Sequence, residues 1–354
     1  MRPRQAVLLL GVFLLSAVSG VLHYAGAEAV LTFIVAGVAL GGLAWAIGFA
    51  TEAVGDRFGA AITGVLQSTL GNLPELFVVL FALRAGETVV AQTSIIGSLF
   101  ANALLVLGLT ILAGAHAAPD GVMRYAKRLP NDTATLLLLA VFIIVLLGLS
   151  DQVGDRASQH VEAISAVGAV CLLVVYAFWL WGYLRGAPTP EAAGSHVEAG
   201  APHIGLVLAL VLLAATGVGA ALVSEWFVAE LDPAVADLGV SKAFTGLVIV
   251  AIAGNAVEHF VGISLALKGK NELAISVVKN SVAQIAAFLF PVLVLLSFAF
   301  TTPLTFVLAP VYVGALALMA ISVWQVTGDG ESVAFEGWAL VALYVVLAVL
   351  SFYE

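Results

Sequence analysis

Apolar segments long enough to cross a bilayer as a helix, about 20 residues each, recur along this chain from one end to the other. Each segment is continuously apolar, with Leu, Ala and Gly dominating, and none shows the alternation of apolar and polar residues expected of a membrane β-barrel. Hydrophobic residues make up 62% of the chain and charged residues 10%, so it is far more apolar than a soluble domain. The sequence therefore predicts an all-α, polytopic membrane protein.

Eleven segments are expected to span the membrane, and most connections between them are short. The longest polar connection, at 185–202, is rich in Pro, Gly, Ala and Glu and is expected to be a flexible linker between two halves. The chain then divides into an extra first helix (1–28), five helices (29–184), the linker, and five more helices (203–354). The expected spans are 5–22, 29–52, 60–83, 87–113, 131–150, 160–184, 203–228, 240–267, 272–298, 304–326 and 335–352.

The Lys and Arg residues of the connections indicate an orientation, because cytoplasmic loops of membrane proteins carry an excess of them. With a cytoplasmic amino terminus, nine of the 13 basic residues fall on the cytoplasmic side, three on the opposite side, and Lys279 inside a span. This bias predicts a cytoplasmic amino terminus and linker, and a carboxyl terminus on the other side. The basic start of the chain would also fit a signal peptide, but no cleavage site leads into a soluble domain, which favours an uncleaved helix.

A sequence element of the form G-N-x-x-E occurs twice, at 71–75 in the third expected span and at 254–258 in the eighth. The two copies lie 183 residues apart, and the same spacing relates further identical residues through the following span. Because the copies lie five spans apart, an odd number, they cross the membrane in opposite directions, as in the inverted repeats of secondary transporters, which bind substrate where the halves meet. The further matches are Phe77 and Phe260, Val78 and Val261, Gly86 and Gly269, Ala91 and Ala274, and Ser98 and Ser281.

Glu75 and Glu258 close the two elements and are expected deep in the membrane. A charged side chain there costs at least about 2.5–3.5 kcal/mol on insertion scales, so each carboxyl group must be protonated or share a bound cation. Burial favours the protonated form and a divalent cation favours the charged form, so protons and cation compete for the same oxygens. The amide oxygens of Asn72 and Asn255 lie next to the glutamates in the sequence. Gly and Pro74 weaken the helix and free backbone carbonyls. Together with the carboxylates, these oxygens make an all-oxygen shell that suits Ca²⁺. Neither a thiolate nor a histidine pair is present to favour a soft metal.

Two rows of polar residues recur every four positions in the spans that follow these elements. Each row lies on one helix face, where it would either supply ligands to the site or hydrogen-bond neighbouring helices. Both alternatives stay open for each serine. The first row is Ser94, Ser98 and Asn102, and the second is Ser276, Asn280 and Gln284.

The segments around both elements resemble the paired signature regions of the calcium/proton exchangers, which belong to the calcium/cation antiporter superfamily. They read LQSTLGNLPELFVVLFALRAGETVVAQTSIIGSLFANALLVLG and GLVIVAIAGNAVEHFVGISLALKGKNELAISVVKNSVAQIAAFLFP. The resemblance covers both halves and implies one extra helix, two inverted five-helix repeats, and exchange of Ca²⁺ for H⁺ by alternating access. It also implies that Glu75 and Glu258 are the central cation and proton ligands, beside Asn72 and Asn255. Polar positions that line the family's site are matched by Gln92, Ser98, Ser281 and Gln284.

Three more residues gain a role through the same resemblance. His259 matches the family's histidine after the second glutamate, where it either gates or shuttles protons near neutral pH or serves packing alone. Glu52 ends the second span on the cytoplasmic side and Glu225 ends the seventh on the far side, and both resemble acidic residues on the family's sliding helices. One carboxylate at each mouth of the transport path would suit ion access from alternate faces of the membrane. The alternative is that each of these residues only ends a helix in solvent.

Lys279 and Asn280 depart from the family, which usually has an apolar residue and a glycine there. We expect Lys279 to extend its amino group to the cytoplasmic interface, since it lies about two turns into its span. The alternative is an ion pair with Glu258 or Glu75, which would alter cation selectivity and stoichiometry. Asn280 removes a glycine where close helix approach is expected.

The nearest rival function is an antiporter of the same fold that exchanges Na⁺ or another monovalent cation for protons. A sodium/calcium exchanger is disfavoured, because its signature elements are rich in Ser and Thr where this chain has Gly-Asn. An intramembrane hydrolase lacks its motifs here, so no enzyme activity is expected, and inverted repeats around buried acids favour alternating access over a channel. Cys171 is the only cysteine, so no disulfide is expected within the chain. No cluster of Lys and Arg indicates binding of nucleic acid. We expect no cofactor, and we expect the partners to be the lipid bilayer and inorganic cations. The expected location is a prokaryotic plasma membrane, and assembly into a homo-oligomer is left open.

Overall fold

The structure is a computed structural model of the 354-residue chain, and it describes residues 3–55, 70–185 and 204–354. The first part of the third expected span and almost all of the linker lie outside these ranges. So do the side chains of Glu52 and Glu258, although both residues are placed within helices.

The described residues are almost entirely helical. Nine of their helices are long and apolar enough to cross a membrane, or ten if the bent pair Leu231–Leu238 and Lys242–Gly254 is one span. The prediction of an all-α membrane protein is therefore confirmed. The count of eleven stays a prediction, because the third span is described only in part.

The first half contains long helices, a short strand and two segments of other helical form. Its elements are α1 (Pro3–Tyr24), α2 (Ala29–Gly55), α4 (Leu73–Ala85), α5 (Thr88–Phe100), the π-helix η1 (Ala101–Val106), α6 (Leu107–Ala117), β1 (Val122–Arg124), α7 (Arg128–Val153), the 3₁₀ helix η2 (Arg156–His160) and α8 (Val161–Arg185).

The second half follows a similar order and contains two further π-helices. Its elements are α10 (Leu206–Ala229), α11 (Leu231–Leu238), α12 (Lys242–Phe244), the π-helix η3 (Thr245–Val250), α13 (Ala251–Gly254), α14 (Ala256–Leu267), α15 (Asn271–Gln284), the π-helix η4 (Ile285–Leu289), α16 (Phe290–Ser297), α17 (Pro310–Thr327), β2 (Glu331–Val333) and α18 (Ala334–Phe352).

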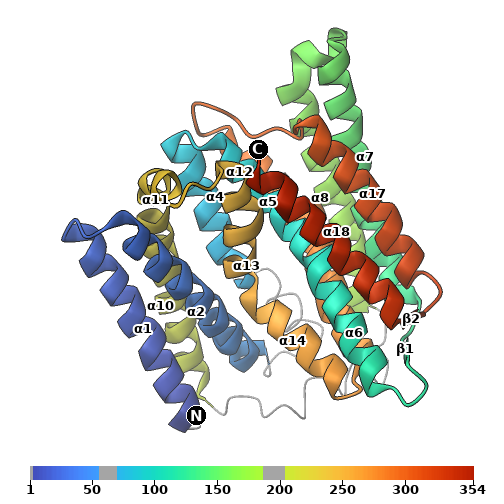
Figure 1. The fold of residues 1–354 in the computed structure, drawn as a ribbon, viewed down its shortest axis with the longest axis horizontal. Coiled ribbons are helices and arrows are strands. Elements are labelled where there is room, and N and C mark those ends of the chain that lie inside the picture. Colours follow the sequence, from blue (N-terminus) through green and yellow to red (C-terminus); the bar gives the residue numbers. More distant parts are fainter. Residues whose placement is uncertain (1–2, 56–69, 186–203) are drawn as a thin grey trace.

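The helices form three groups side by side (Figure 1). In Figure 1, α1, α2 and α10 lie on one side, α7, α8 and α17 on the other, and α4 to α6, α12 to α14 and α18 between them. Helix α2 packs on α10, α7 on α17, and α14 on α15. The outer helices expose many large apolar side chains, as helices facing lipid do, whereas α5 and α15 are mostly buried. The two termini lie at opposite ends of the molecule (Figure 1).

Strands β1 and β2 connect the two halves at one end of the molecule. They pair antiparallel, with Val122 opposite Val333, and so join the α6–α7 connection to the α17–α18 connection. The hydroxyl groups of Tyr125 and Ser332 are 2.6 Å apart beside this pair. Burial raises the pKa of the Tyr125 hydroxyl to about 12, so the group stays neutral and hydrogen-bonded at physiological pH.

A close crossing of α5 and η3 determines how the halves meet. A Cβ atom at Gly97 of α5 would lie 2.5 Å from the Cα atom of Leu247, so only glycine allows this approach of two backbones. Gly246 makes the reciprocal contact and would meet Thr93 if it carried a side chain. The crossing brings the residue after Gly97, Ser98, toward the second G-N-x-x-E element.

Candidate cation site

Both G-N-x-x-E elements lie where a helix is interrupted and starts again. Asn72 precedes α4 with φ −85° and ψ 6°, and Asn255 precedes α14 with φ −112° and ψ 14°. Each helix then continues from the Asn carbonyl, which accepts from Leu76 N at 3.0 Å in one element and from His259 N at 3.2 Å in the other. Pro74 fits the first turn of α4 because its missing N–H has no acceptor there.

The interruption places each glutamate at the third position of the restarted helix. The first turn of a helix carries unpaired N–H groups and the positive end of the helix dipole, which favours a negative charge. Glu75 is 1% exposed there. Glu258 occupies the same position of α14, although its side chain is outside the described part of the structure.

Glu75 faces the backbone of the second element. A Cβ atom at Gly254 would lie 3.7 Å from the Glu75 Cβ atom, so no side chain separates the two elements there. A cavity of about 10 Å³, roughly the space for one water molecule, opens beside this contact. It is lined by Leu40, Pro74, Glu75, Val78, Phe227, Val250, Ala253 and Gly254.

A hydrogen bond joins the second element to the polar row of α5. The Asn255 amide Nδ2 donates to Ser98 Oγ at 2.9 Å and to Ala251 O at 3.0 Å. Asn102 Nδ2 donates to Ser98 O at 3.1 Å. These donors orient the amides and leave both Oδ1 atoms buried without a partner among the described residues, which is the arrangement a hard cation could use.

Oxygen donors other than carboxylates dominate this region. The described residues contain no group of three or more His, Cys, Asp or Glu placed to hold a metal ion. Asn72 is buried where α4 starts, and Ser281 of α15 has a buried hydroxyl without a partner in the described ranges. A cation here would therefore take most of its ligands from amide, hydroxyl and carbonyl oxygens around Glu75.

Comparison with known proteins identifies the family. The family model described as sodium/calcium exchanger protein matches residues 28–184 and 208–353. The Ca²⁺/H⁺ antiporter of Synechocystis sp. is 31% identical over 350 residues, covering 94% of this chain and 93% of that protein. The Ca²⁺/H⁺ antiporter ChaA of Bacillus subtilis is 32% identical over 345 residues, covering 95% of each. The solved structure of native YfkE is 28% identical, covers 98% of this chain and 99% of its own, and superposes with a TM-score of 0.80.

The chain belongs to the calcium/proton exchanger family.

Because it belongs to this family, the exchanger is an integral membrane transporter and not an enzyme, as predicted from the sequence. The likeness to YfkE extends over nearly the whole chain, so the helix breaks described above lie within the shared fold.

Several polar residues that the family resemblance or the polar rows offered as ligands have other neighbours in the exchanger. Gln92 Nε2 donates to Val307 O at 3.1 Å, in the segment between α16 and α17. Ser94 Oγ donates within its own helix, to Ala91 O at 3.1 Å. Gln284 is buried beside the Tyr176 hydroxyl of α8. The structure thus groups Ser98, Asn102 and Asn255, places Gln92 and Gln284 beside other elements, and leaves Ser94 bonded within its own helix.

The residues expected at the mouths and in proton transfer have the following surroundings, and their roles stay predictions. Glu225 is half exposed, and its Oε1 lies 3.7 Å from Arg84 NH1 at the end of α4. His259 follows the second glutamate in α14 and has a buried Nε2 without a partner among the described residues. Asn280 likewise has a buried, unpartnered Oδ1 in the described part of the chain. Glu52 lies in the last turn of α2, and its role stays a prediction.

Lys279 differs from its expected position. It is 1% exposed, so its amino group does not reach the membrane surface as the sequence suggested. Its Nζ donates to Thr327 Oγ1 of α17 at 3.3 Å. Thr327 is the last residue of α17, and a single sequence does not reveal that the end of this helix lies beside Lys279.

The π-helices are a feature that sequence reasoning missed. Two of them begin at residue 101 (η1) and residue 285 (η4), within one residue of the repeat spacing. Asn102, the last residue of the first polar row, lies in η1, and Gln284, the last of the second row, directly precedes η4. A π-helical turn shifts the register of side chains around the helix, and such turns are frequent at functional sites. The occurrence of π-helices at equivalent positions of the two halves can be recognised only in the structure.

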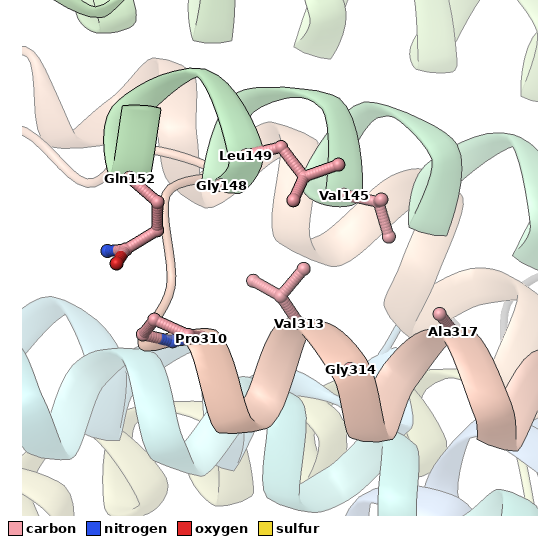
Figure 2. A pocket seen from close by; sticks show the side chains of 8 residues that line it. All are labelled: Val145, Gly148, Leu149, Gln152, Pro310, Val313, Gly314 and Ala317. Carbon is pink, nitrogen blue, oxygen red and sulfur yellow. The ribbon is translucent and has the colours of Figure 1, made fainter. Parts of the chain in front are cut away.

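A larger cavity of about 220 Å³ between α7 and α17 is not a cation site (Figure 2). Among its lining residues Gln152 is the one with a polar side chain, at the end near Pro310 (Figure 2), and none of them is acidic. Its lining residues are Val145, Gly148, Leu149, Gln152, Pro310, Val313, Gly314 and Ala317.

Proposed function

We propose that this exchanger moves Ca²⁺ against H⁺ by alternating access, with Glu75 and Glu258 binding Ca²⁺ and protons in turn. The observation that carries the proposal is the same helix break in both halves, with a glutamate in each restarted turn and Glu75 buried against Gly254. The names of the Synechocystis and Bacillus relatives support the choice of ions.

The chemistry follows from burial. A buried glutamate that holds neither a proton nor a cation is costly, so the site alternates between two filled states. Asn255 and Ser98 belong to the site because their hydrogen bond holds one amide oxygen open beside the second element. Asn72 and Ser281 take the corresponding places from the other half under the repeat spacing. No resident cofactor is needed, because the cation is cargo.

We further propose eleven membrane-spanning helices, arranged as one extra helix (1–28) and two inverted repeats (29–184 and 203–354) joined by a cytoplasmic linker (185–202). The two stretches that match the family model, 28–184 and 208–353, support this division. The equivalent residues Gly86 and Gly269 both have a left-handed backbone, with φ 82° and 71°, directly before an inner helix. The opposite ends of the termini in Figure 1 support an odd number of crossings, with a cytoplasmic amino terminus in a prokaryotic plasma membrane.

Other polar residues would serve the path rather than the centre. Gln92 of α5 and Gln284 of α15 would lie along the path of the ions, and His259 follows the proposed ligand Glu258 directly. Glu52 and Glu225 would lie near the two mouths of the path. Exchange of a monovalent cation is the second candidate, and the buried Lys279 favours it, because any positive charge at that position opposes a divalent ion more strongly than a monovalent one.

Reconstitution into proteoliposomes tests the proposal. An imposed Ca²⁺ gradient should drive protons in the opposite direction. A pH-sensitive dye inside the vesicles reports the proton movement, and accumulation of ⁴⁵Ca²⁺ in the vesicles reports Ca²⁺ uptake. Glu75→Gln and Glu258→Gln should each reduce exchange at least about 100-fold while the protein stays folded, because the amide mimics the protonated acid. The matched control is Glu162→Gln at an exposed site in α8, which should exchange like the wild type.

Two results would contradict the proposal. Wild-type exchange by either buried-site variant would remove the glutamates from the mechanism. Ca²⁺ flux without opposing protons would indicate a channel.

A further inference from the structure

Lys242, the first residue of α12, lies at the end of the molecule opposite the strands β1 and β2 (Figure 1). Its Nζ is 2.7 Å from Glu87 Oε2, in the connection between α4 and α5, and 2.6 Å from Asp232 Oδ1 of α11. Both distances are short, as those of charge-assisted hydrogen bonds are. Lys242 is 40% exposed and Glu87 16%, so the cluster is partly shielded from water. One ammonium group therefore binds two carboxylates that come from different helices.

Lys242 and Glu87 are held by the central helices. Helix α12 packs on α5, which Glu87 directly precedes, and on α18. The ring of Phe244 in α12 meets that of Phe352 in α18 edge to face, with the centroids 5.4 Å apart. Helix α12 also continues directly into η3, which packs on α5 at the close glycine crossing. These two partners of the cluster therefore belong to one packed unit.

Asp232 belongs to a different unit, the group of α1, α2 and α10. Helix α11 follows α10 and packs on α2 through its buried apolar face. It meets α12 at a bend of 116°, where Gly239 has a left-handed backbone with φ 64°. Asp232 lies seven residues before Gly239, about 10 Å along the helix. A rotation of about 20° at the bend would then move Asp232 by roughly 3–4 Å and break its contact with Lys242.

The same three-helix group covers the proposed cation site. Leu40 of α2 and Phe227 of α10 line the cavity beside Glu75, together with Val250 of η3. Glu75 is 1% exposed, so access for an ion requires movement of the helices around it. Because the cavity is bounded both by the group and by the central helices, separation of the two units would open it.

Other polar contacts between the two units are longer. Ser224 Oγ of α10 donates to Pro74 O of α4 at 3.5 Å. Glu225 Oε1 lies 3.7 Å from Arg84 NH1, and both of these side chains are about half exposed or more. The bridge at Lys242 is shorter than either contact, and it lies where α11 and α12 join the two units.

We propose that Lys242 is a latch that holds the three-helix group against the central helices and keeps the site closed toward the end of the molecule that carries Glu87. This inference rests on the proposed alternating access, in which the site opens to one face at a time. Under the proposed topology, this end faces away from the cytoplasm. An ion pair between partly exposed groups supports about a two- to fivefold change in population. Breaking it lets the site open more often toward that face and not toward the other.

Reaction of a single cysteine tests the latch in the full chain. The background variant is Cys171→Ser with Val250→Cys, which places the only thiol in the cavity beside Glu75. A small, membrane-impermeant methanethiosulfonate is added to right-side-out and to inside-out vesicles from bacterial cells that express the protein. Asp232→Asn should speed the reaction about two- to fivefold from the face that carries α11, and should not speed it from the cytoplasmic face.

Three controls accompany this measurement. Asp237→Asn removes the other carboxylate of α11, which is also exposed, and should change neither rate. Asp237→Cys in the Cys171→Ser chain identifies the face that carries α11. Choline chloride at about 0.5 M on that face should speed the reaction of the background variant but change that of Asp232→Asn little, because salt screens a partly exposed ion pair.

The latch is overturned if Asp232→Asn leaves the reaction from the α11 face unchanged, speeds it equally from both faces, or is matched by Asp237→Asn. An equal rise from both faces would mean that the ion pair only stabilises the fold. Those results leave the proposed function standing as long as the unmodified chain exchanges Ca²⁺ for protons and Glu75→Gln does not. Exchange by Glu75→Gln would instead remove the proposed function.

Discussion

The crossing at Gly97 makes a quantitative prediction about how closely the two halves must approach. A Cβ atom in Gly97→Ala would lie 2.5 Å from both Cα and the carbonyl oxygen of Leu247, whereas ordinary van der Waals contact begins at 3.4 Å. The obstacle is backbone, which cannot rotate away as a side chain can. Helix α5 and η3 must therefore move apart by about 1 Å.

Two effects follow from that displacement. Overpacking of this kind costs about 1–3 kcal/mol of stability. The Ser98–Asn255 hydrogen bond, now 2.9 Å, joins α5 to the residue that follows η3 and α13 in the same stretch of helix, and it would lengthen beyond hydrogen-bonding distance. A misplacement of about 1 Å in a working site commonly costs about 100-fold in rate. We expect Gly97→Ala to fold with reduced thermal stability and to exchange about 100-fold more slowly.

The assay pairs thermal unfolding in detergent with ⁴⁵Ca²⁺ uptake into proteoliposomes. The matched control is Gly314→Ala in α17, where a Cβ atom would meet nothing within 4 Å. Alanine should stabilise that helix by up to about 1 kcal/mol and leave transport unchanged. Wild-type stability and uptake in Gly97→Ala would refute the reasoning, since the two backbones could not then be as close as described.

Two further predictions concern single hydrogen bonds. Ser98→Ala should lower the apparent Ca²⁺ affinity about 5- to 10-fold in uptake assays, because the Asn255 amide loses one of its two acceptors, whereas Ser94→Ala should change little since Ser94 bonds within its own helix. Tyr125→Phe should cost about 1 kcal/mol at neutral pH through the lost bond to Ser332. The pKa of Tyr125, raised to about 12, gives stability that is present below pH 10 and lost between about pH 10 and 12, so unfolding midpoints across that range should fall less steeply in Tyr125→Phe than in the wild type.

The positions of most helices follow from the sequence, because a continuous apolar run has few alternatives in a bilayer. The expected spans 29–52 and 160–184 correspond to Ala29–Gly55 and Val161–Arg185. The internal structure of the spans does not follow in the same way. The eighth expected span, 240–267, contains α12, η3, α13 and α14, and the separate helix α11 meets it at a bend of 116°.

These misses have physical causes. An α-helix and a π-helix can be built from the same apolar residues and differ by one residue in the hydrogen-bond register, so composition does not distinguish them. The break at Gly-Asn was expected only as a weakening of the helix, and whether such a helix bends or restarts depends on what packs against it. Gln92 illustrates the same limit for the site, since its acceptor is Val307, 215 residues away.

The repeat itself is more symmetrical at its glutamates than on the helices around them. The position equivalent to Gly97 under the spacing of 183 residues is Asn280, so α15 carries a side chain where α5 leaves room for a neighbouring backbone. The buried Lys279 adjoins it and has no equivalent charge, because the corresponding residue of α5 is Ile96. The two matching elements therefore work in unequal surroundings, because α5 crosses a neighbouring backbone at Gly97, whereas α15 carries the side chains of Lys279 and Asn280 at the equivalent positions. Since a carboxylate responds to the charge and packing around it, the two glutamates cannot be equivalent in the exchange cycle, whatever their shared sequence motif.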